Sequence, residues 1–185
     1  MKIILKSKNL QQNKKEDNEE VHLINQFFIP KDQERYNEIK FCLKSNVNNK
    51  KIDKIHLLVE KPYSNKELGV KSDKIIQVSI QKRLSYNDFF TYIRINNLNG
   101  YIILANSDIY IPPESVSNVK KSNLKENKQF CALLRHEYKK NASHIFGPRY
   151  DSQDTWIIHS NNTIPVFSEH LFAFCLGTPG CDNKI

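Results

Sequence analysis

A short polar triplet, Asn106-Ser107-Asp108, directly follows the apolar run Tyr101–Ala105. Such a run predicts a strand covered on both faces, and in an open parallel sheet ligands bind beyond the carboxyl ends of the strands. Amide, hydroxyl and carboxylate oxygens at that edge suit a hard divalent cation, which can bridge two phosphate groups. The same triplet also fits a turn in which asparagine and aspartate bond their own backbone.

A second candidate group is the segment 152–156, in which Asp154 stands two residues before Trp156, the only tryptophan of the chain. A carboxylate beside an indole ring can hold the hydroxyls and the apolar face of a sugar. The alternative is a capping or surface carboxylate next to a tryptophan of the core.

The third candidate is a loop with two glycines and a proline, residues 177–183, which ends in Asp182 and Asn183. Glycines let the backbone approach a ligand closely, and Asp182 is then a candidate general base or an anchor for an acceptor hydroxyl. A plain Gly-Pro turn, with Asp182 capping a helix, is the alternative.

Alternating strand and helix patterns must position these groups. An apolar run over 22–29 predicts a strand that stops at Pro30, and Asp32 can cap a helix that continues through Leu43. Further strands are predicted at 54–60, 74–80 and 101–105, with a helix capped by Ser85 before the last of them. Strands that alternate with helices in this way predict an α/β domain with a parallel, doubly wound sheet.

The remaining segments are less regular. Residues 7–20 hold almost no apolar side chain, so we expect residues 1–20 to be a flexible segment and the folded domain to span 21–185. Beyond the central strand we predict a short helix over 114–121, a strand over 130–135 and a loop over 144–152. The length of 185 residues fits a single domain.

Charge and composition limit the partners. The formal net charge of +8 would suit a nucleic-acid-binding protein, but the lysines are spread through polar stretches and do not cluster with aromatic residues. We therefore expect no nucleic-acid partner. No apolar stretch approaches the roughly 20 residues that cross a bilayer, so we expect no transmembrane segment. Cys42 and Cys131 stand among apolar neighbours, as buried thiols of a reducing compartment do, which favours the cytoplasm, or the host cytoplasm for a viral protein.

Taken together, the three motifs resemble those of a group of viral and eukaryotic glycosyltransferase-like proteins of GT-A fold. The likeness is carried by the segments 104–110, 132–135, 152–156 and 176–183, and it covers roughly residues 21–185. It implies a GT-A-like (Rossmann-like), mostly parallel sheet with flanking helices in a single domain. In that fold an Asp-x-Asp motif at a strand end holds a manganese or magnesium ion and the diphosphate of the sugar donor.

The resemblance also implies a role for each candidate residue. Asp108 takes the place of the final, metal-binding Asp of the motif, and Asn106 stands where the family has its first Asp. Asp182 would be the base that deprotonates the acceptor hydroxyl, with Asp154 as a second catalytic carboxylate. The further contacts to donor or acceptor are expected from Asn25, Arg83, Asn106, Ser107, Trp156 and Asn183.

The resemblance therefore predicts metal-dependent transfer of a sugar from a nucleoside-diphosphate sugar to a hydroxyl of a glycan, protein or lipid acceptor, with Mn2+ or Mg2+ as cofactor. Asn106 removes one negative charge from the metal corner, which weakens cation binding unless another carboxylate compensates. Family members also continue beyond the loop 177–183, so the chain is expected to lack the C-terminal part. The alternative is a catalytically inactive remnant that keeps a nucleotide-sugar or glycan pocket.

Overall fold

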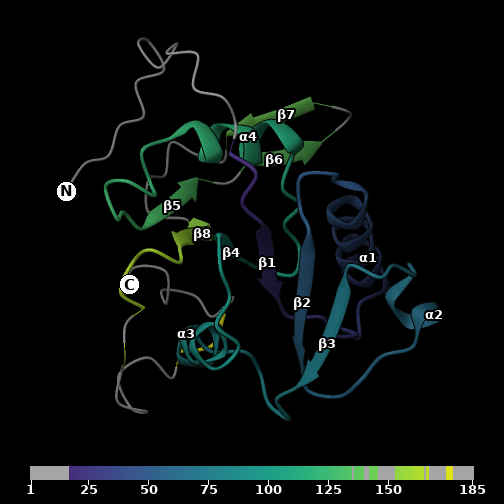
Figure 1. Ribbon diagram of the computed structural model, residues 1–185. Helices are drawn as coiled ribbons and strands as arrows, with labels where there is room; N and C mark the ends of the chain where they lie inside the picture. The colour runs from purple at the N-terminus through teal and green to yellow at the C-terminus, as the bar shows by residue number, and fades with distance from the viewer. Residues whose placement is uncertain are drawn as a thin grey trace.

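Strands and helices alternate along the chain as far as β4, and strands predominate afterwards (Figure 1). The protein is represented by a computed structural model that describes residues 17–134, 136–139, 142–145, 153–164, 166 and 174–176. The described strands are β1 (Val21–Asn25), β2 (Lys54–Val59), β3 (Ile75–Ser79), β4 (Tyr101–Ala105), β5 (Cys131–Leu134), β6 (His136–Lys139), β7 (Ala142–Ile145) and β8 (Gln153–His159). The described helices are α1 (Gln33–Asn48), α2 (Asn65–Leu68), α3 (Tyr86–Ile95) and α4 (Pro113–Lys121).

Six strands form one sheet in the order β3-β2-β1-β4-β8-β5, and β6 pairs with β7 in a separate two-stranded sheet. β1 to β4 are parallel, whereas β8 runs antiparallel to both β4 and β5. The predicted α/β fold with a mostly parallel sheet and flanking helices is confirmed. The expectation of a parallel sheet is wrong at β8. Parallel neighbours are usually joined through a helix, whereas the described part of the connection from β5 to β8 consists of the strands β6 and β7.

The order in which the strands are added to the sheet reverses at β1. From β1 the chain passes through β2 to β3 on one side, and it then crosses to β4 on the other side of β1 (Figure 1). In the β1–β4 pair, Leu23 lies opposite Ile103 and Ile24 lies opposite Leu104. The carboxyl ends of these two strands therefore lie side by side, at the topological switch point where open α/β sheets bind ligands.

The two faces of the sheet have separate hydrophobic cores. Because side chains alternate between the faces of a strand, Leu23 and Ile103 belong to the core beneath α1 and α4, and Ile24 and Leu104 belong to the core beneath α3. All four side chains are fully buried. A slip of one residue would exchange the two faces, so this double burial fixes the register of the strands.

Two predicted helix starts are confirmed by their caps. The side chain of Asp32 accepts a hydrogen bond from the Arg35 amide at 2.8 Å and begins α1. Ser85 and Asp88 form a reciprocal capping box at the start of α3. Since each helix follows a parallel strand, both N-termini lie towards the carboxyl edge of the sheet. In the described part of the chain, no helix is long and apolar enough to span a membrane.

The strands predicted at 54–60, 74–80, 101–105 and 130–135 agree with the structure within one residue at each end. The strand predicted at 22–29 ends earlier, at Asn25, although Phe27 beyond it is buried. β7 occupies the beginning of the loop predicted at 144–152. α2 and β8 are absent from the predicted elements, because α2 is a single turn and polar residues at the start of β8 obscure its apolar pattern.

The last residues of the expected flexible segment, 17–20, contact the amino edge of the sheet. The carboxylate of Glu19 bonds to His159 at the end of β8 and to Lys125. The Tyr101 hydroxyl at the start of β4 donates to Asp17 at 3.0 Å. Residues 1–16 lie outside the described residues.

A chain of hydrogen bonds between buried histidines links β1, β2 and α3. His22 Nδ1 lies 3.0 Å from His56 Nε2, and His56 Nδ1 lies 2.9 Å from the Tyr92 hydroxyl. His22 Nε2 lies 3.0 Å from the carbonyl oxygen of Asn99, which can only accept. With both rings neutral, His22 therefore donates to Asn99, His56 donates to His22 and Tyr92 donates to His56.

We expect acid to destabilise the protein through His56. Burial, together with the charges of His22 and Lys54, lowers the pKa of His56 from 6.5 to about 4. Between these values the unfolded chain binds a proton that the folded chain does not, so this stability is present above about pH 6.5 and is lost as the pH falls towards 4.

Urea unfolding at pH 7.5 and pH 5 measures the effect, with a His56→Gln variant as the reference. The wild-type protein should lose about 2 kcal/mol more than this variant between the two pH values. Equal losses in the two proteins would contradict the assignment.

Candidate functional site

The triplet after β4 forms a turn at the carboxyl edge of the sheet. The Ile109 amide bonds back to the Asn106 carbonyl oxygen at 3.1 Å, a turn of the kind that the residue types also allow. The side chains nevertheless reach other elements: Asn106 Nδ2 donates to Asp154 Oδ1 at 2.6 Å, and Ser107 Oγ donates to the Gln26 carbonyl oxygen at 2.6 Å. The turn therefore joins the ends of β1 and β4 to the start of β8.

Asp154 brings a carboxylate to the corner where Asn106 stands. Besides the side-chain contact, the backbone amide of Asn106 donates to the backbone carbonyl oxygen of Asp154 at 3.0 Å. An aspartate at position 106 would set two carboxylates at hydrogen-bond distance, and two such groups cannot both ionise freely without a proton or a cation between them. The side-chain amide of Asn106 can thus donate to Asp154, and the carboxylate at this corner comes from β8.

Two buried amide oxygens at the same edge have no hydrogen-bond partner among the described residues. They are the Oδ1 atoms of Asn25, the last residue of β1, and of Asn106. Asn25 is only 2% exposed, and because nearly all buried polar atoms in folded proteins are paired, each exception calls for an explanation. Amide oxygens at the end of a strand are suitable donor atoms for a hard cation and suitable acceptors for a ligand hydroxyl.

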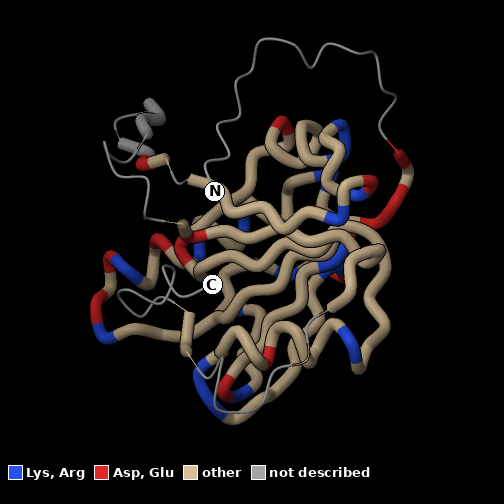
Figure 2. Tube along the Cα trace, turned by 90° about the vertical axis from the view of Figure 1, so that its left-hand side faces the viewer, with Lys and Arg blue, Asp and Glu red and all other residues tan. Residues whose placement is uncertain are grey.

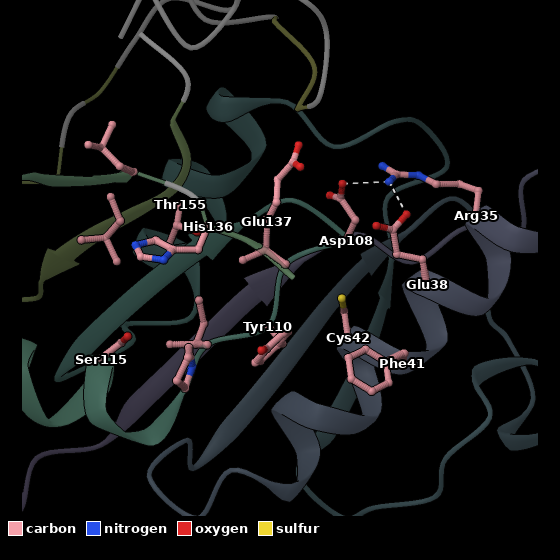
Figure 3. A pocket seen from close by; sticks show the side chains of 15 residues that line it. Arg35, Glu38, Phe41, Cys42, Asp108, Tyr110, Ser115, His136, Glu137 and Thr155 are labelled. Atoms are coloured by element: carbon pink, nitrogen blue, oxygen red, sulfur yellow. Dashed lines mark hydrogen bonds and ion pairs between the residues drawn. The ribbon is translucent and has the colours of Figure 1, made fainter. Parts of the chain in front are cut away.

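The carboxylate of Asp108 is neutralised by Arg35 from the first turn of α1. Nη1 of Arg35 lies 2.8 Å from Asp108 Oδ2 and 2.6 Å from Glu38 Oε2 (Figure 3). Burial alone would lower the pKa of Arg35, but the charges and hydrogen bonds of Asp108 and Glu38 outweigh it and hold that pKa above its ordinary value. A metal ion that binds Asp108 must therefore displace this guanidinium or share the carboxylate with it.

The described residues fit a cation that is bound partly by the phosphates of a ligand better than a cation that protein side chains hold alone. Within the described ranges, no three Asp, Glu, His or Cys side chains converge on a point where they could hold a metal. Mg2+ is commonly held by one or two carboxylates together with substrate phosphates. At this edge Asn106 contacts the carboxylate of Asp154, and Asp108 follows two residues after Asn106 in the same turn.

A cavity of about 610 Å³ opens beside Asp108, between α1, the segment after β4 and the strands β5, β6 and β8 (Figure 3). Asp108 and Glu38 line it together with the rings of Phe41 and Tyr110, which meet edge to face with centroids 5.9 Å apart. Its size is typical of sites for small molecules. Burial and the neighbouring carboxylates raise the pKa of the Cys42 thiol in its wall to about 12, so this thiol is not a nucleophile at neutral pH. We call this cavity the α1 pocket.

Trp156 lies in the core and not in the α1 pocket. Its side chain is 2% exposed and meets the ring of Tyr86 edge to face, with centroids 5.1 Å apart. Because side chains alternate along β8, the neighbouring Thr155 lines the pocket. The aromatic rings at the pocket are those of Phe41 and Tyr110, which the sequence analysis did not assign to a site. The available signal was Phe41 itself, an apolar residue on the exposed side of a helix that buries Ile39, Cys42 and Leu43.

The side chain of Gln26, directly after β1, forms two hydrogen bonds with the loop after β3. Gln26 Nε2 donates to the Lys82 carbonyl oxygen at 3.3 Å, and the Leu84 amide donates to Gln26 Oε1 at 3.2 Å. Arg83 in the same loop donates from Nη2 to the Leu176 carbonyl oxygen at 2.6 Å. The guanidinium of Arg83 therefore holds the segment 174–176, and its contact with a diphosphate stays a prediction.

Asp182 and Asn183 lie outside the described residues. Their assignment as a catalytic base and a binding residue therefore stays a prediction. Of the other candidates, the structure brings Asn106, Ser107 and Asp154 together, whereas Trp156 is separated from them in the core.

The charged residues surround the strands without forming a single basic face in the view of Figure 2. Lys, Arg, Asp and Glu are interspersed along the loops and helix ends, and the strands between them are nearly uncharged.

No protein-family model matches the sequence, and no curated protein matches it either. Solved structures with a related arrangement include the crystal structure of 4-diphosphocytidyl-2C-methyl-D-erythritol synthase. That match covers 77% of this chain and 75% of the other chain, with 8% sequence identity and a TM-score of 0.41. A likeness this distant concerns the arrangement of strands and helices and carries no functional information. Membership of the glycosyltransferase-like group is thus not shown by any match.

We expect Asn106→Asp to destabilise the protein at neutral pH. The substitution replaces the Nδ2 donor, 2.6 Å from Asp154 Oδ1, by a carboxylate oxygen. Loss of the hydrogen bond and repulsion between the carboxylates should lower the free energy of unfolding by roughly 1–3 kcal/mol. Urea unfolding at pH 7.5 measures this loss, and millimolar Mn2+ should restore part of it, since the ion would neutralise the new pair.

The matched control is Asn118→Asp, which makes the same change of charge at an exposed position of α4. It should alter the free energy of unfolding by less than about 0.5 kcal/mol. Equal stability of the two variants in the absence of metal would show that the contact between residues 106 and 154 is not made as described.

Proposed function

We propose that the protein binds a nucleoside-diphosphate sugar at the carboxyl edge of β1 and β4 and transfers the sugar to an acceptor hydroxyl, with the help of Mn2+ or Mg2+. The observation that carries this proposal is the pair of buried amide oxygens, on Asn25 and Asn106, without a partner among the described residues at the topological switch point. Two carboxylates, Asp108 and Asp154, belong to the same edge. Nucleotides bind at this point in many open α/β sheets.

The roles of the residues follow from their donor atoms. Asp108 and Asp154, with the amide oxygen of Asn106, would hold the cation, which supplies neutralising charge to the leaving diphosphate. Asn25 would accept a hydrogen bond from the base or the ribose. The N-termini of α1 and α3 at this edge carry partial positive charge, which also favours a phosphate group.

Arg35 is the cationic side chain best placed to take part. It is bonded to Asp108 and Glu38, and a cation at Asp108 would compete for one of these two contacts. A guanidinium released from a carboxylate can bind a diphosphate through two parallel hydrogen bonds. We therefore assign Arg35 to the diphosphate, in addition to the expected contact from Arg83.

Deprotonation of the acceptor hydroxyl requires a carboxylate that is free to take a proton. One carboxylate oxygen of Asp154 is already engaged by a short hydrogen bond from Asn106. Asp182 is therefore our first candidate for the base and Asp154 the second. Three described cysteines, Cys42, Cys131 and Cys175, are free thiols, which supports the cytoplasm as the compartment of the reaction.

We expect binding of the sugar donor to require the divalent cation. Isothermal titration with UDP- and GDP-sugars, each with and without Mn2+, tests this. At least one donor should bind with Mn2+ and lose at least about tenfold in affinity without it, since the diphosphate then meets the carboxylates of this edge without the positive charge of the cation. Asp108→Asn should produce a loss of similar size.

The control for that titration is Asp73→Asn, which removes an exposed carboxylate just before β3, at the opposite, amino edge of the sheet. Its donor affinity should stay within about twofold of wild type. Metal-independent binding, or an Asp108→Asn variant that binds as well as the Asp73→Asn protein, would overturn the metal assignment.

The second candidate function is a binding protein without turnover. The Arg35–Asp108 ion pair favours it, because a neutralised carboxylate has less affinity for a metal ion. This alternative predicts donor or glycan binding with no release of nucleoside diphosphate, whereas the enzyme releases it in proportion to sugar transferred. A coupled assay for UDP or GDP in the presence of acceptors separates the two.

A further inference from the structure

The α1 pocket is acidic although the chain as a whole is basic. Among the described residues, the carboxylates of Glu38 and Asp108 line it and share one guanidinium, that of Arg35. The chain as a whole has a net charge of +8. In a concave site the local charges dominate the potential, so an anionic ligand is repelled from this pocket. The diphosphate of a donor is therefore expected along the β1–β4 edge and not deep in the pocket.

The pocket also presents aromatic surface to solvent. Phe41 is 53% exposed, and its ring is held edge to face by Tyr110. Leu134, 40% exposed, lines the same cavity. Exposed apolar side chains that gather in a concave site offer a surface for the apolar face of a ligand.

The polar groups of the lining are suited to hydroxyl groups. Carboxylates only accept hydrogen bonds, while the hydroxyls of Ser115 and Thr155 can both donate and accept. A ligand with several hydroxyls can bond to both kinds of group, and a face of C–H groups can pack against the aromatic wall. An uncharged saccharide has both properties, and the volume of about 610 Å³ lies in the range of small-molecule sites.

We propose that the α1 pocket binds a neutral saccharide, with one sugar ring lying against Phe41 and its hydroxyls bonded to Glu38 and Asp108. If the proposed glycosyl transfer is correct, on which this step rests, the saccharide is the acceptor. Asp108 then lies between the two substrates, because it belongs to both the pocket and the β1–β4 edge. A glycan is thereby preferred over a lipid or a protein as acceptor.

The test is a printed array of neutral glycans and of sialylated or sulfated glycans, followed by isothermal titration with the neutral glycan that is retained most strongly. Wild-type protein should retain neutral glycans in preference to acidic ones. Phe41→Ala should weaken the titrated affinity at least about tenfold, since stacking on an aromatic ring is lost. Because Phe41 is half exposed, the variant is expected to fold.

Ile95→Ala provides the matched control, because it truncates an exposed apolar side chain, 74% exposed, at the end of α3 on the other face of the sheet. It should leave glycan affinity within about twofold of wild type. Retention of no neutral glycan, preference for acidic glycans, or unchanged affinity in Phe41→Ala would overturn the proposal.

Titration of the same variants with the nucleotide sugar and Mn2+ separates this proposal from the proposed function. Donor affinity that is unchanged in Phe41→Ala, while glycan affinity falls, supports two distinct subsites. Donor affinity that falls equally would assign the pocket to the donor and overturn the proposal. Phe41-dependent glycan binding without any donor binding would support the saccharide site and remove the transferase.

Discussion

The parallel pairing of β1 with β4 is the constraint on which the site depends. β1 has a strand on each side and a hydrophobic core on each face, so its register with β4 is set by apolar burial and not by the polar residues at its end. With Ile24 opposite Leu104, the register brings Asn25 beside Ala105, and Asn106 follows one residue later at the same edge. Apolar packing elsewhere in the sheet therefore keeps the side-chain amide oxygens of Asn25 and Asn106 buried. Among the described residues, neither oxygen has a hydrogen-bond partner.

The antiparallel direction of β8 determines which charges reach this edge. Because Trp156 pairs with Leu104, the first residues of β8 lie beside the last residues of β4, and Asp154 meets Asn106. A parallel strand in the same place would bring its first residues to the opposite edge. An Asp-x-Asp motif supplies both of its carboxylates from one loop. Here one carboxylate, Asp108, comes from the loop after β4, and the other, Asp154, comes from a strand some 45 residues later in the chain.

The sequence predicted the parts of the fold that local patterns determine. The apolar run of β4, the caps Asp32 and Ser85 and the polar triplet after β4 are local signals, and the structure has the corresponding strand, helices and edge turn. Contacts between distant segments were not predictable in this way. The pairing of β8 with β4 and the ion pair of Arg35 with Asp108 depend on tertiary packing, which also places Trp156 in the core and leaves Phe41 at the pocket.

Asp108 belongs to both the β1–β4 edge and the α1 pocket, so the two sites cannot be electrically independent. In the structure Arg35 divides its charge between Asp108 and Glu38, which are both partly exposed. A cation at Asp108 would reduce the negative charge of the pocket. The guanidinium of Arg35 would then pair with Glu38 alone or bind a phosphate. At separations of a few ångströms near a protein surface, one such charge changes a neighbouring interaction by on the order of a few kcal/mol. Linkage then requires a reciprocal effect of the pocket ligand on the edge, so occupation of either site should alter the affinity of the other.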